Sequence, residues 1–382
     1  MALIDNSETQ SSESIITIKL IYLFICFLLG VVGNLFVIIS IRKYKKLQTI
    51  TNFFVLNLAI SDLLYSLCGV PVIFITTVAK KWLLGNFLCD AIGFLNTLLL
   101  TTSIWTLVMI SINRYINVAK PNEVKNLYTN KRTTLIIIGV WIFSALISIP
   151  PLFGWSEFKS GSNFCTINGK KSKSYSLFLV LLVYLVPLGF LCGLYLQIFF
   201  LLNKHKKIQT RSNLDPICNS EHLEKQLTFG NVVFSSIPNP VHTVHCSNNN
   251  KSAKIYLLPE ASPPIKSKKT LNRKNCLILQ SRNAKENLQK LAIKKHFKQV
   301  RITKMLMVLV LSFFLCWTPL ILGSLLYSFT INLKGFQMMT FGIMCCTLNC
   351  ILNPFIYSAM NSSFRKCFFQ MWTTIFKYIK CK

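Results

Sequence analysis

The sequence predicts an all-α membrane protein, a bundle of seven transmembrane helices with the N-terminus outside the cell and the C-terminus inside. Three observations carry this prediction. The 382 residues are 52% hydrophobic and only 14% charged, whereas about 25% of the residues in a soluble domain are charged. Seven stretches are apolar over a length that crosses a bilayer core about 30 Å thick. Most basic residues lie in the connectors on one side of these stretches.

The seven predicted spans follow one another with polar or basic connectors between them. Each has at least the roughly 20 residues that a helix needs to cross the hydrocarbon core. Only the second contains a charged residue, Asp62. The first is too long for the apolar region of a secretory signal peptide, and no basic segment precedes it. The spans are residues 20–41, 53–79, 91–113, 133–156, 174–203, 305–333 and 335–361.

The positions of the basic residues predict the orientation. With an external N-terminus, the inner connectors 42–52, 114–132, 203–304 and 362–382 hold 4, 5, 20 and 5 of the 42 Lys and Arg residues. Lys and Arg favour the cytoplasmic side of membrane spans. The 34 basic and six acidic residues of these connectors carry +28 of the formal net charge of +30, so the excess charge is cytoplasmic. A nucleic-acid binder is excluded, because its basic residues would interleave with polar and aromatic surface.

We expect three parts along the chain: an extracellular tail (1–19), a transmembrane domain (20–361), and a cytoplasmic helix and tail (362–382). A long basic third cytoplasmic loop, 204–299, interrupts the domain and is expected to be largely disordered. Apolar residues recur at helical spacing near the end of this loop. That end is either a solvated extension of the sixth helix or a basic amphipathic helix that meets anionic lipid or a partner.

Two cysteines are predicted on the outer side. Cys89 precedes the third span, and Cys165 lies in the loop between the fourth and fifth spans. A disulfide between them is expected in an oxidising exterior, and it would hold the loop over the mouth of the bundle. On the inner side, Cys367 and Cys381 are candidates for palmitoylation, with ordinary membrane-edge cysteines as the alternative.

Asp62 is the one carboxylate predicted at bilayer depth, where an ionised side chain is costly and marks a functional site. Four polar residues at similar depth are candidate neighbours. Together they would suit Na⁺, or they form a polar network that holds helices together. No motif of a metalloprotease, a P-loop or a serine hydrolase occurs, so no enzyme and no other metal is expected. The candidate neighbours are Asn34, Ser103, Asn349 and Asn353.

Several motifs stand in a characteristic order on the spans. They are Gly33-Asn34, Leu58-Ala59-Ile60-Ser61-Asp62, Asn113-Arg114-Tyr115, Cys316-Trp317-Thr318-Pro319 and Asn353-Pro354-Phe355-Ile356-Tyr357. In this order they resemble the motifs of a rhodopsin-like (class A) G-protein-coupled receptor. The resemblance covers about residues 20–375, apart from the middle of the third inner loop.

Two features are similar to particular branches of that family. The stretch from Pro150 to Ser156 is opsin-like, and the Asn113-Arg114-Tyr115 triplet is similar to that of melatonin receptors. Opsins hold retinal on a lysine of the seventh span. Thr347 stands at the matching place, and residues 335–361 contain no lysine, so no retinal is expected.

The resemblance also implies a ligand pocket. Asn96 stands where aminergic receptors carry an Asp, so a cationic amine would have no counter-ion. A neutral small molecule, or a peptide that engages the outer loops, is expected instead. The implied pocket residues are Asn96, Thr97, Leu100, Leu179, Val183, Trp317, Leu320, Ile321, Ser324 and Thr347.

The implied activity is two-state signalling across the plasma membrane to a heterotrimeric G protein, with arrestin, receptor kinases and membrane lipids as further partners. The Asp62 cluster matches the family's sodium pocket. Because Asn113 replaces the usual Asp beside Arg114, we expect ligand-free signalling, unless hydrogen bonds from Asn113 hold Arg114. The implied activation switch comprises Asn113, Arg114, Tyr115, Tyr195, Trp317, Pro319, Pro354 and Tyr357.

The alternative class is a membrane transporter or channel. Such a protein should show repeated halves, broken helix pairs or several intramembrane charges. The sequence shows none of these features.

Overall fold

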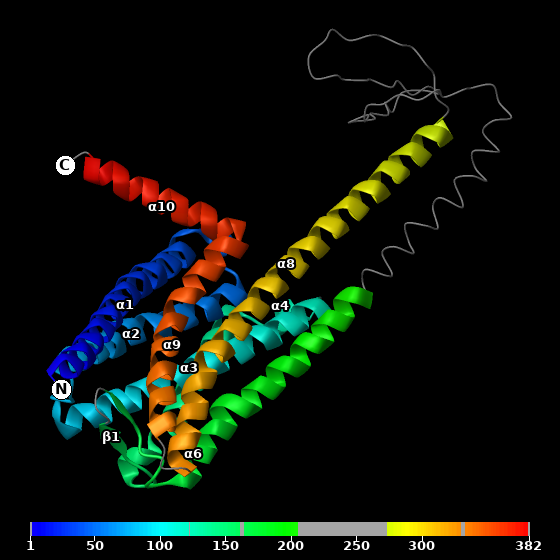
Figure 1. The fold of residues 1–382 in the computed structure, drawn as a ribbon. Coiled ribbons are helices and arrows are strands. Elements are labelled where there is room, and N and C mark those ends of the chain that lie inside the picture. Colours follow the sequence, from blue (N-terminus) through cyan, green and yellow to red (C-terminus); the bar gives the residue numbers. More distant parts are fainter. Residues whose placement is uncertain (1, 122, 161–163, 205–272, 330–332, 381–382) are drawn as a thin grey trace. The chain divides into compact units, whose positions relative to one another are not determined.

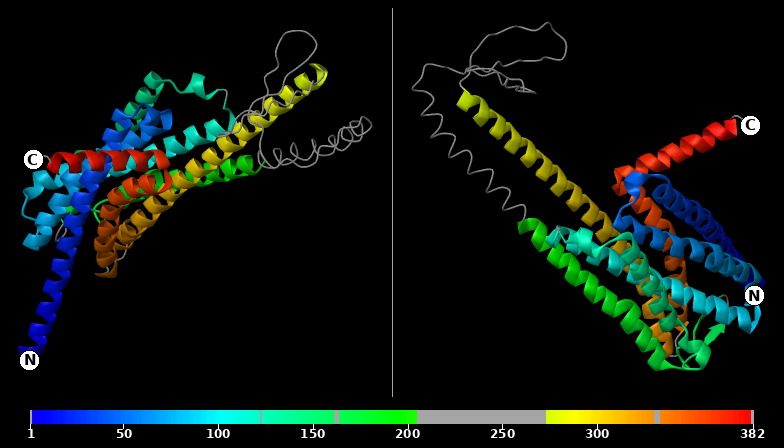
Figure 2. Two further views of the ribbon diagram at one scale, coloured as in Figure 1. Left: turned by 90° about the horizontal axis from the view of Figure 1, so that it is seen from above. Right: turned by 180° about the vertical axis from the view of Figure 1, so that it is seen from behind.

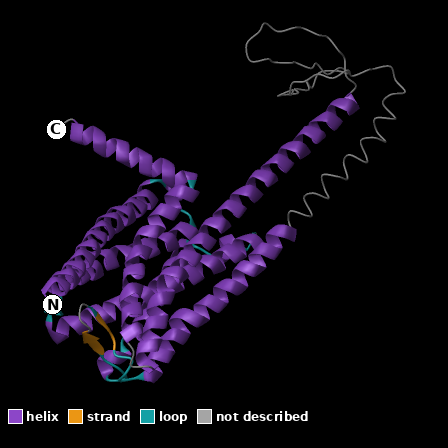
Figure 3. Ribbon diagram, in the orientation of Figure 1, coloured by secondary structure: helices purple, strands orange, loops and turns teal. Residues whose placement is uncertain are grey.

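A computed structural model describes residues 2–121, 123–160, 164–204, 273–329 and 333–380. The chain divides into two compact units, residues 1–202 with 301–382 and residues 203–300. In the second unit, the described residues 203–204 and 273–300 are helical. In the first, helices account for nearly all of the described chain, and the described strands form a single pair (Figure 3).

Apart from residues 205–272, which the structure does not describe, the elements follow one another with short connections. An additional helical stretch, residues 186–204, continues from η3. The elements are α1 (Ala2–Lys43), η1 (Lys45–Leu47), α2 (Ile50–Ala79), α3 (Gly85–Ala119), α4 (Val124–Leu127), α5 (Asn130–Ser148), η2 (Pro150–Phe153), β1 (Phe158–Ser160), β2 (Cys165–Ile167), α6 (Lys173–Leu179), η3 (Val180–Leu185), α8 (Arg273–Phe329), α9 (Leu333–Met360) and α10 (Ser362–Lys380).

The predicted all-α bundle of seven membrane-crossing helices is confirmed. Seven helices of the described chain are long and apolar enough to cross a bilayer. They are Glu13–Lys43, Ile50–Ala79, Gly85–Ala119, Asn130–Phe153, Lys173–Lys204, Phe297–Phe329 and Gln337–Met360.

Two boundaries differ from the sequence prediction. Helix α1 begins at Ala2, so the residues expected as a tail, 1–19, are mostly a continuation of the first helix. The helix expected near the end of the third inner loop is present, and it begins earlier than residue 285, at Arg273. Residues 205–272, the rest of that loop, lie outside the described residues.

The surface of α1 shows why the bundle belongs in lipid. Ile21, Phe24 and Leu28 are 56%, 54% and 44% exposed. They recur at helical spacing and form one apolar face. An apolar face of this extent is unstable in water but is matched by hydrocarbon.

Polar side chains mark the starts of two helices. The hydroxyl of Thr49 accepts a hydrogen bond from the backbone N–H of Asn52 at the start of α2. Thr129 does the same for Arg132 at the start of α5. Each hydroxyl satisfies one of the four N–H groups that the first turn of a helix leaves open.

Four prolines away from the ends of the spans lie within helical segments. Pro71, Pro319 and Pro354 are inside α2, α8 and α9. Pro187 follows η3, which is a π-helical turn. Because proline lacks an N–H and crowds the carbonyl four residues earlier, the regular hydrogen-bond pattern breaks there, and the wider π-turn accommodates the change.

The first three long helices pack one against the next (Figure 1). Helix α1 contacts α2 and α9, α2 contacts α3, and α3 contacts α5. Buried Asn57 joins three of these helices, because its Nδ2 donates to Thr106 on α3 (2.8 Å) and its Oδ1 accepts from the indole of Trp141 on α5 (2.9 Å). Each such interhelical bond contributes about 0.6 kcal/mol on average in a membrane bundle.

Helix α10 continues from α9 after a break at Asn361 and leaves the bundle at a steep angle to α9 (Figure 2). Its first apolar residue, Phe364, is fully buried and stacks on Tyr357 of α9, with ring centroids 5.6 Å apart. The helix predicted after residue 361 is thereby confirmed.

Helices α8 and α9 touch through their backbones. A Cβ added to Gly342 would lie 2.3 Å from the backbone nitrogen of Leu320, and one added to Gly323 would lie 2.5 Å from that of Met339. Small residues permit such close approach of membrane helices, where van der Waals packing drives association.

Gly342→Ala should therefore destabilise the protein, because the new methyl group would force the two helices apart. We expect a clearly lower midpoint of thermal unfolding in purified protein. Gly139→Ala in α5 is the matched control, since a Cβ there meets no atom within 4 Å. It should leave the midpoint unchanged or raise it, by up to about 1 kcal/mol of stability. Equal midpoints for the two variants would contradict the close contact.

Candidate ligand cavity and inner switch

A short hairpin covers the outer end of the bundle. Strands β1 and β2 pair antiparallel, with Phe158 opposite Ile167 and Ser160 opposite Cys165. A disulfide joins Cys165 to Cys89 on α3, with Cα atoms 5.4 Å apart, which confirms the predicted pair. The ring of Phe158 lies against Gly93, where any Cβ would come within 2.3 Å of it. The hairpin is thus fixed to α3 by a covalent bond and by close packing.

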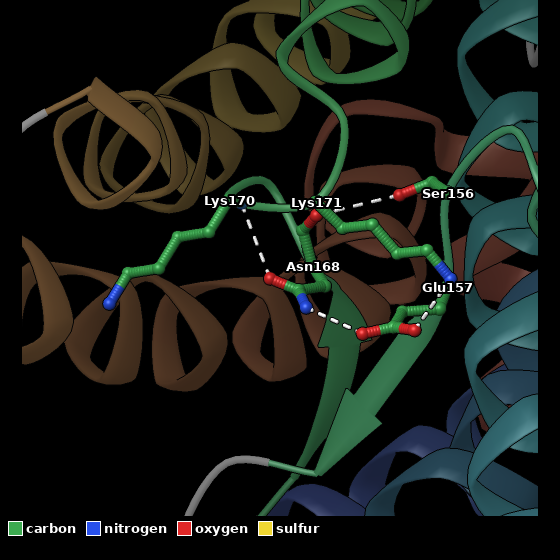
Figure 4. Close-up of polar contacts among 5 residues, drawn as sticks. All are labelled: Ser156, Glu157, Asn168, Lys170 and Lys171. Carbon is green, nitrogen blue, oxygen red and sulfur yellow. Dashed lines mark hydrogen bonds and ion pairs between the residues drawn. The ribbon is translucent and has the colours of Figure 1, made fainter.

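A polar cluster at the base of the hairpin adds a second restraint (Figure 4). The carboxylate of Glu157 accepts hydrogen bonds from Asn168 Nδ2 and from Lys171 Nζ, both at 2.7 Å. These bonds, that from Lys171 first, lower the pKa of Glu157 below its usual range. Figure 4 shows that the side chain of Lys170, the residue before Lys171, points away from this cluster.

Beneath the hairpin lies a cavity of about 160 Å³. Nine of the ten pocket residues that the sequence implied line its wall. Thr347 does not; its hydroxyl donates to the carbonyl of Met344 and contacts the hydroxyl of Tyr22 on α1. The nine are Asn96, Thr97, Leu100, Leu179, Val183, Trp317, Leu320, Ile321 and Ser324.

Sequence reasoning missed the part of the wall that the hairpin supplies. Phe164, Thr166 and Ile167 line the cavity beside Cys165. The disulfide was a usable signal, because residues next to Cys165 must lie over the outer end of α3. Residues of α2 and α9, such as Ile73 and Ile343, also line it, and they were missed because each is one of many apolar residues on its span.

The wall of the cavity is uncharged. No Asp, Glu, Lys or Arg is among the described residues that line it. Two buried polar atoms in the wall have no hydrogen-bond partner: the acceptor Asn96 Oδ1 and the donor Trp317 Nε1. A buried polar group without a partner is costly, so this wall is suited to a molecule that carries neutral hydrogen-bonding groups.

Trp317 connects the cavity to the core. Its side chain is 9% exposed and stacks on Phe313 one turn earlier in α8, with ring centroids 5.7 Å apart. Next to it, the hydroxyl of Thr318 is 2.6 Å from that of Tyr184. Tyr184 lies in the π-turn, so the residues around Pro319 are joined to the irregular turn before Pro187.

Asp62 lies deeper in the bundle and is 3% exposed. Asn353 Nδ2 donates to Asp62 Oδ2 at 2.7 Å and links α2 to α9. Ser103 and Asn349 are buried, and the Oδ1 atom of Asn349 has no partner. Asn34, the fourth candidate, donates instead to the carbonyls of Gly30 and Cys350.

At the inner end, Arg114 is held by a neutral hydroxyl. Its guanidinium donates to Thr51 Oγ1 on α2 at 2.9 Å, and Thr51 in turn donates to Asn113 Oδ1 at 2.8 Å. Arg114 is 7% exposed and Asn113 is fully buried. The sequence singled out Asn113 and Arg114 but not Thr51, which joins them.

The other switch residues are spread along the bundle. Tyr195 accepts a hydrogen bond from Ser111 on α3 at 3.3 Å. Tyr357 is fully buried, whereas Tyr115 is partly exposed. Pro319 and Pro354 lie one or two turns from Phe313 and Tyr357 in α8 and α9.

The two candidate lipidation sites differ. Cys367 packs into the core at the start of α10 and is 8% exposed, and burial raises the pKa of its thiol. Cys381 lies outside the described residues.

Residues 33–357 match the family model of the 7 transmembrane receptor (rhodopsin family). The chain belongs to this family. The structure of squid rhodopsin is similar, with a TM-score of 0.66 and 25% identity, over 93% of this chain and 84% of that one. The transporter or channel alternative is not favoured.

Similar proteins include melanopsins and an adrenergic receptor. Melanopsin-B of Xenopus laevis is 38% identical over 176 residues, which are 44% of this chain and 33% of that protein. The alpha-1A adrenergic receptor of Oryzias latipes is 26% identical over 366 residues, covering 94% of this chain and 67% of that protein. The chain thus spans about a third of the length of the melanopsin that it matches.

Proposed function

We propose that this protein is a plasma-membrane receptor that transmits an extracellular signal to a heterotrimeric G protein. The observation that carries the proposal is an uncharged cavity beneath a disulfide-tied hairpin, combined with a buried Arg114 at the inner end of the same bundle. Arrestin and receptor kinases are proposed as further partners, and nucleic acid is not.

The part of the ligand that enters the cavity is proposed to be uncharged. Asn96 offers no counter-ion to an amine, and an unpaired charge in an uncharged wall would lose its hydration without compensation. This supports a small molecule with neutral hydrogen-bonding groups, or a peptide that engages the outer loops and inserts an apolar residue. Retinal bound through a Schiff base is not proposed, since Thr347 takes the place of the lysine that it needs.

The proposed mechanism is a shift between two conformations. A ligand against Trp317 would favour a bundle in which the inner end of α8 moves outward about Pro319 and opens a cavity for the G protein. A ligand shifts such an equilibrium only by the difference in its affinity for the two conformations. The ligand would act on the ring of Trp317, which stacks on Phe313.

The test is a screen of neutral small molecules and peptides on reconstituted receptor, read out as nucleotide exchange on G proteins, in darkness and in light. We expect activation by at least one uncharged compound, and none by light alone. An Asn96→Asp variant is the control: it should gain sensitivity to cationic amines, because it supplies a carboxylate in the cavity wall. Ion flux through proteoliposomes without nucleotide exchange would contradict the receptor proposal.

High basal activity is proposed because no acid stands beside Arg114 in the sequence and its partner Thr51 is neutral. Asn113→Asp should lower ligand-free nucleotide exchange, since a charged hydrogen bond is about twice as strong as a neutral one. Thr51→Val should raise it, because it removes the hydroxyl that joins Arg114 to Asn113. Unchanged basal exchange in both variants would show that this network does not restrain the receptor.

A sodium ion is proposed to bind at Asp62. The carboxylate and the unpartnered amide oxygen of buried Asn349 are the hard oxygen ligands that such a cation takes. NaCl should raise the midpoint of thermal unfolding of the wild-type receptor more than choline chloride at equal ionic strength. Asp62→Asn should abolish the difference, and a difference that persists in this variant would place the ion elsewhere.

A further inference from the structure

Among the described residues, two positive charges at the outer rim of the cavity pair with no carboxylate. Lys170 Nζ lies 4.4 Å from the ring centroid of Tyr327, and Lys173 Nζ lies 5.3 Å from that of Phe329. Both rings belong to the outer end of α8. Glu157, the acid of the same loop, pairs with Lys171 at 2.7 Å. An ammonium group over an aromatic ring is attracted to the face of the ring. These two exposed lysines are therefore held in position more firmly than lysines without such a contact.

These two lysines do not line the cavity but lie close in the chain to residues that pack on its wall. Gly169, which precedes Lys170, is so close to α8 that an added Cβ would come within 1.8 Å of Ser328 Oγ and 3.1 Å of Ser176 Oγ. Both serines line the cavity. Lys173 begins α6 three residues before Ser176, and residues three apart on a helix lie on the same face. The cationic groups therefore border the uncharged cavity.

The charged groups and the uncharged lining therefore occupy separate regions of the site. The rim presents two ammonium groups, whereas the wall beneath it presents none. An ionised group would stay at the rim, because burying it in the uncharged wall would remove its hydration without a partner. An anion whose remaining part is uncharged fits both regions at once.

We infer that the ligand is an amphiphile with one anionic oxygen head, a carboxylate or a phosphate, held by Lys170 and Lys173 while its uncharged body fills the cavity. The inference rests on the proposed receptor function and makes its ligand more specific. The portion inside the cavity remains uncharged, and the charge stays at the mouth.

The test uses the purified full chain in nanodiscs of zwitterionic lipid and follows the midpoint of thermal unfolding. The probes share a twelve-carbon chain: dodecanoate, dodecyl phosphate, dodecanol and dodecyltrimethylammonium. We expect one or both anions to raise the midpoint saturably, as a ligand of the folded state does, and to do so less at high salt. The alcohol and the cation should act only at much higher concentrations. The better anion identifies the head group as a carboxylate or a phosphate.

Charge-removing variants then locate the head group. The double variant Lys170→Gln, Lys173→Gln should need about tenfold more anion for the same shift, the loss expected for two exposed ionic contacts. Lys171→Gln is the matched control, because that lysine already pairs with Glu157. Ser324→Trp, which fills the cavity, should abolish the effect. Equal potency of dodecanol and dodecanoate, or an equal loss in the control, would overturn the inference.

Nucleotide exchange on a G protein separates this inference from the proposed function. An anion that binds through the two lysines but never changes exchange supports the ligand class and contradicts the receptor proposal. Activation by other compounds, with no anion binding, supports the receptor and overturns the ligand class.

Discussion

Inside a bilayer, a polar group finds its partner within the protein or goes without one. This constraint decides how the helices are joined. Asn57 bonds to α3 and α5, and Asn353 bonds to Asp62 on α2. Thr51 holds Arg114 and Asn113 together at the inner end. These few contacts select which helices are neighbours, because the apolar surfaces around them would pack in many ways.

The same constraint acts around the cavity. Some buried hydroxyls there and nearby return to a backbone carbonyl, as Thr97 does to Gly93 and Thr101 does to Thr97. At the cavity, Asn96 Oδ1 and Trp317 Nε1 have no such partner. The hairpin and its disulfide hold this wall in place from outside, so the unmatched atoms stay in fixed positions.

Much of this arrangement follows from sequence patterns that act locally. Apolar length predicts the spans, and the sidedness of Lys and Arg predicts their orientation, because both depend only on the bilayer. Long-range pairings are harder to predict. Thr51 reaches Arg114 across 63 positions, and Asn34 turns to Cys350 rather than to Asp62, since side-chain direction depends on how each helix is rotated. The helical start of α1 at Ala2 was missed because polar residues 5–14 carry no apolar period.

The glycine contact between α8 and α9 has a mechanical consequence. Where two backbones already touch, as at Gly342 and Leu320, the helices have no side chains left to compress and so cannot move closer together. Leu320 also lines the cavity, as does Met339, which faces Gly323. A molecule in the cavity can therefore only turn or spread this pair. In the proposed shift between two conformations, the contact would act as a pivot between α8 and α9.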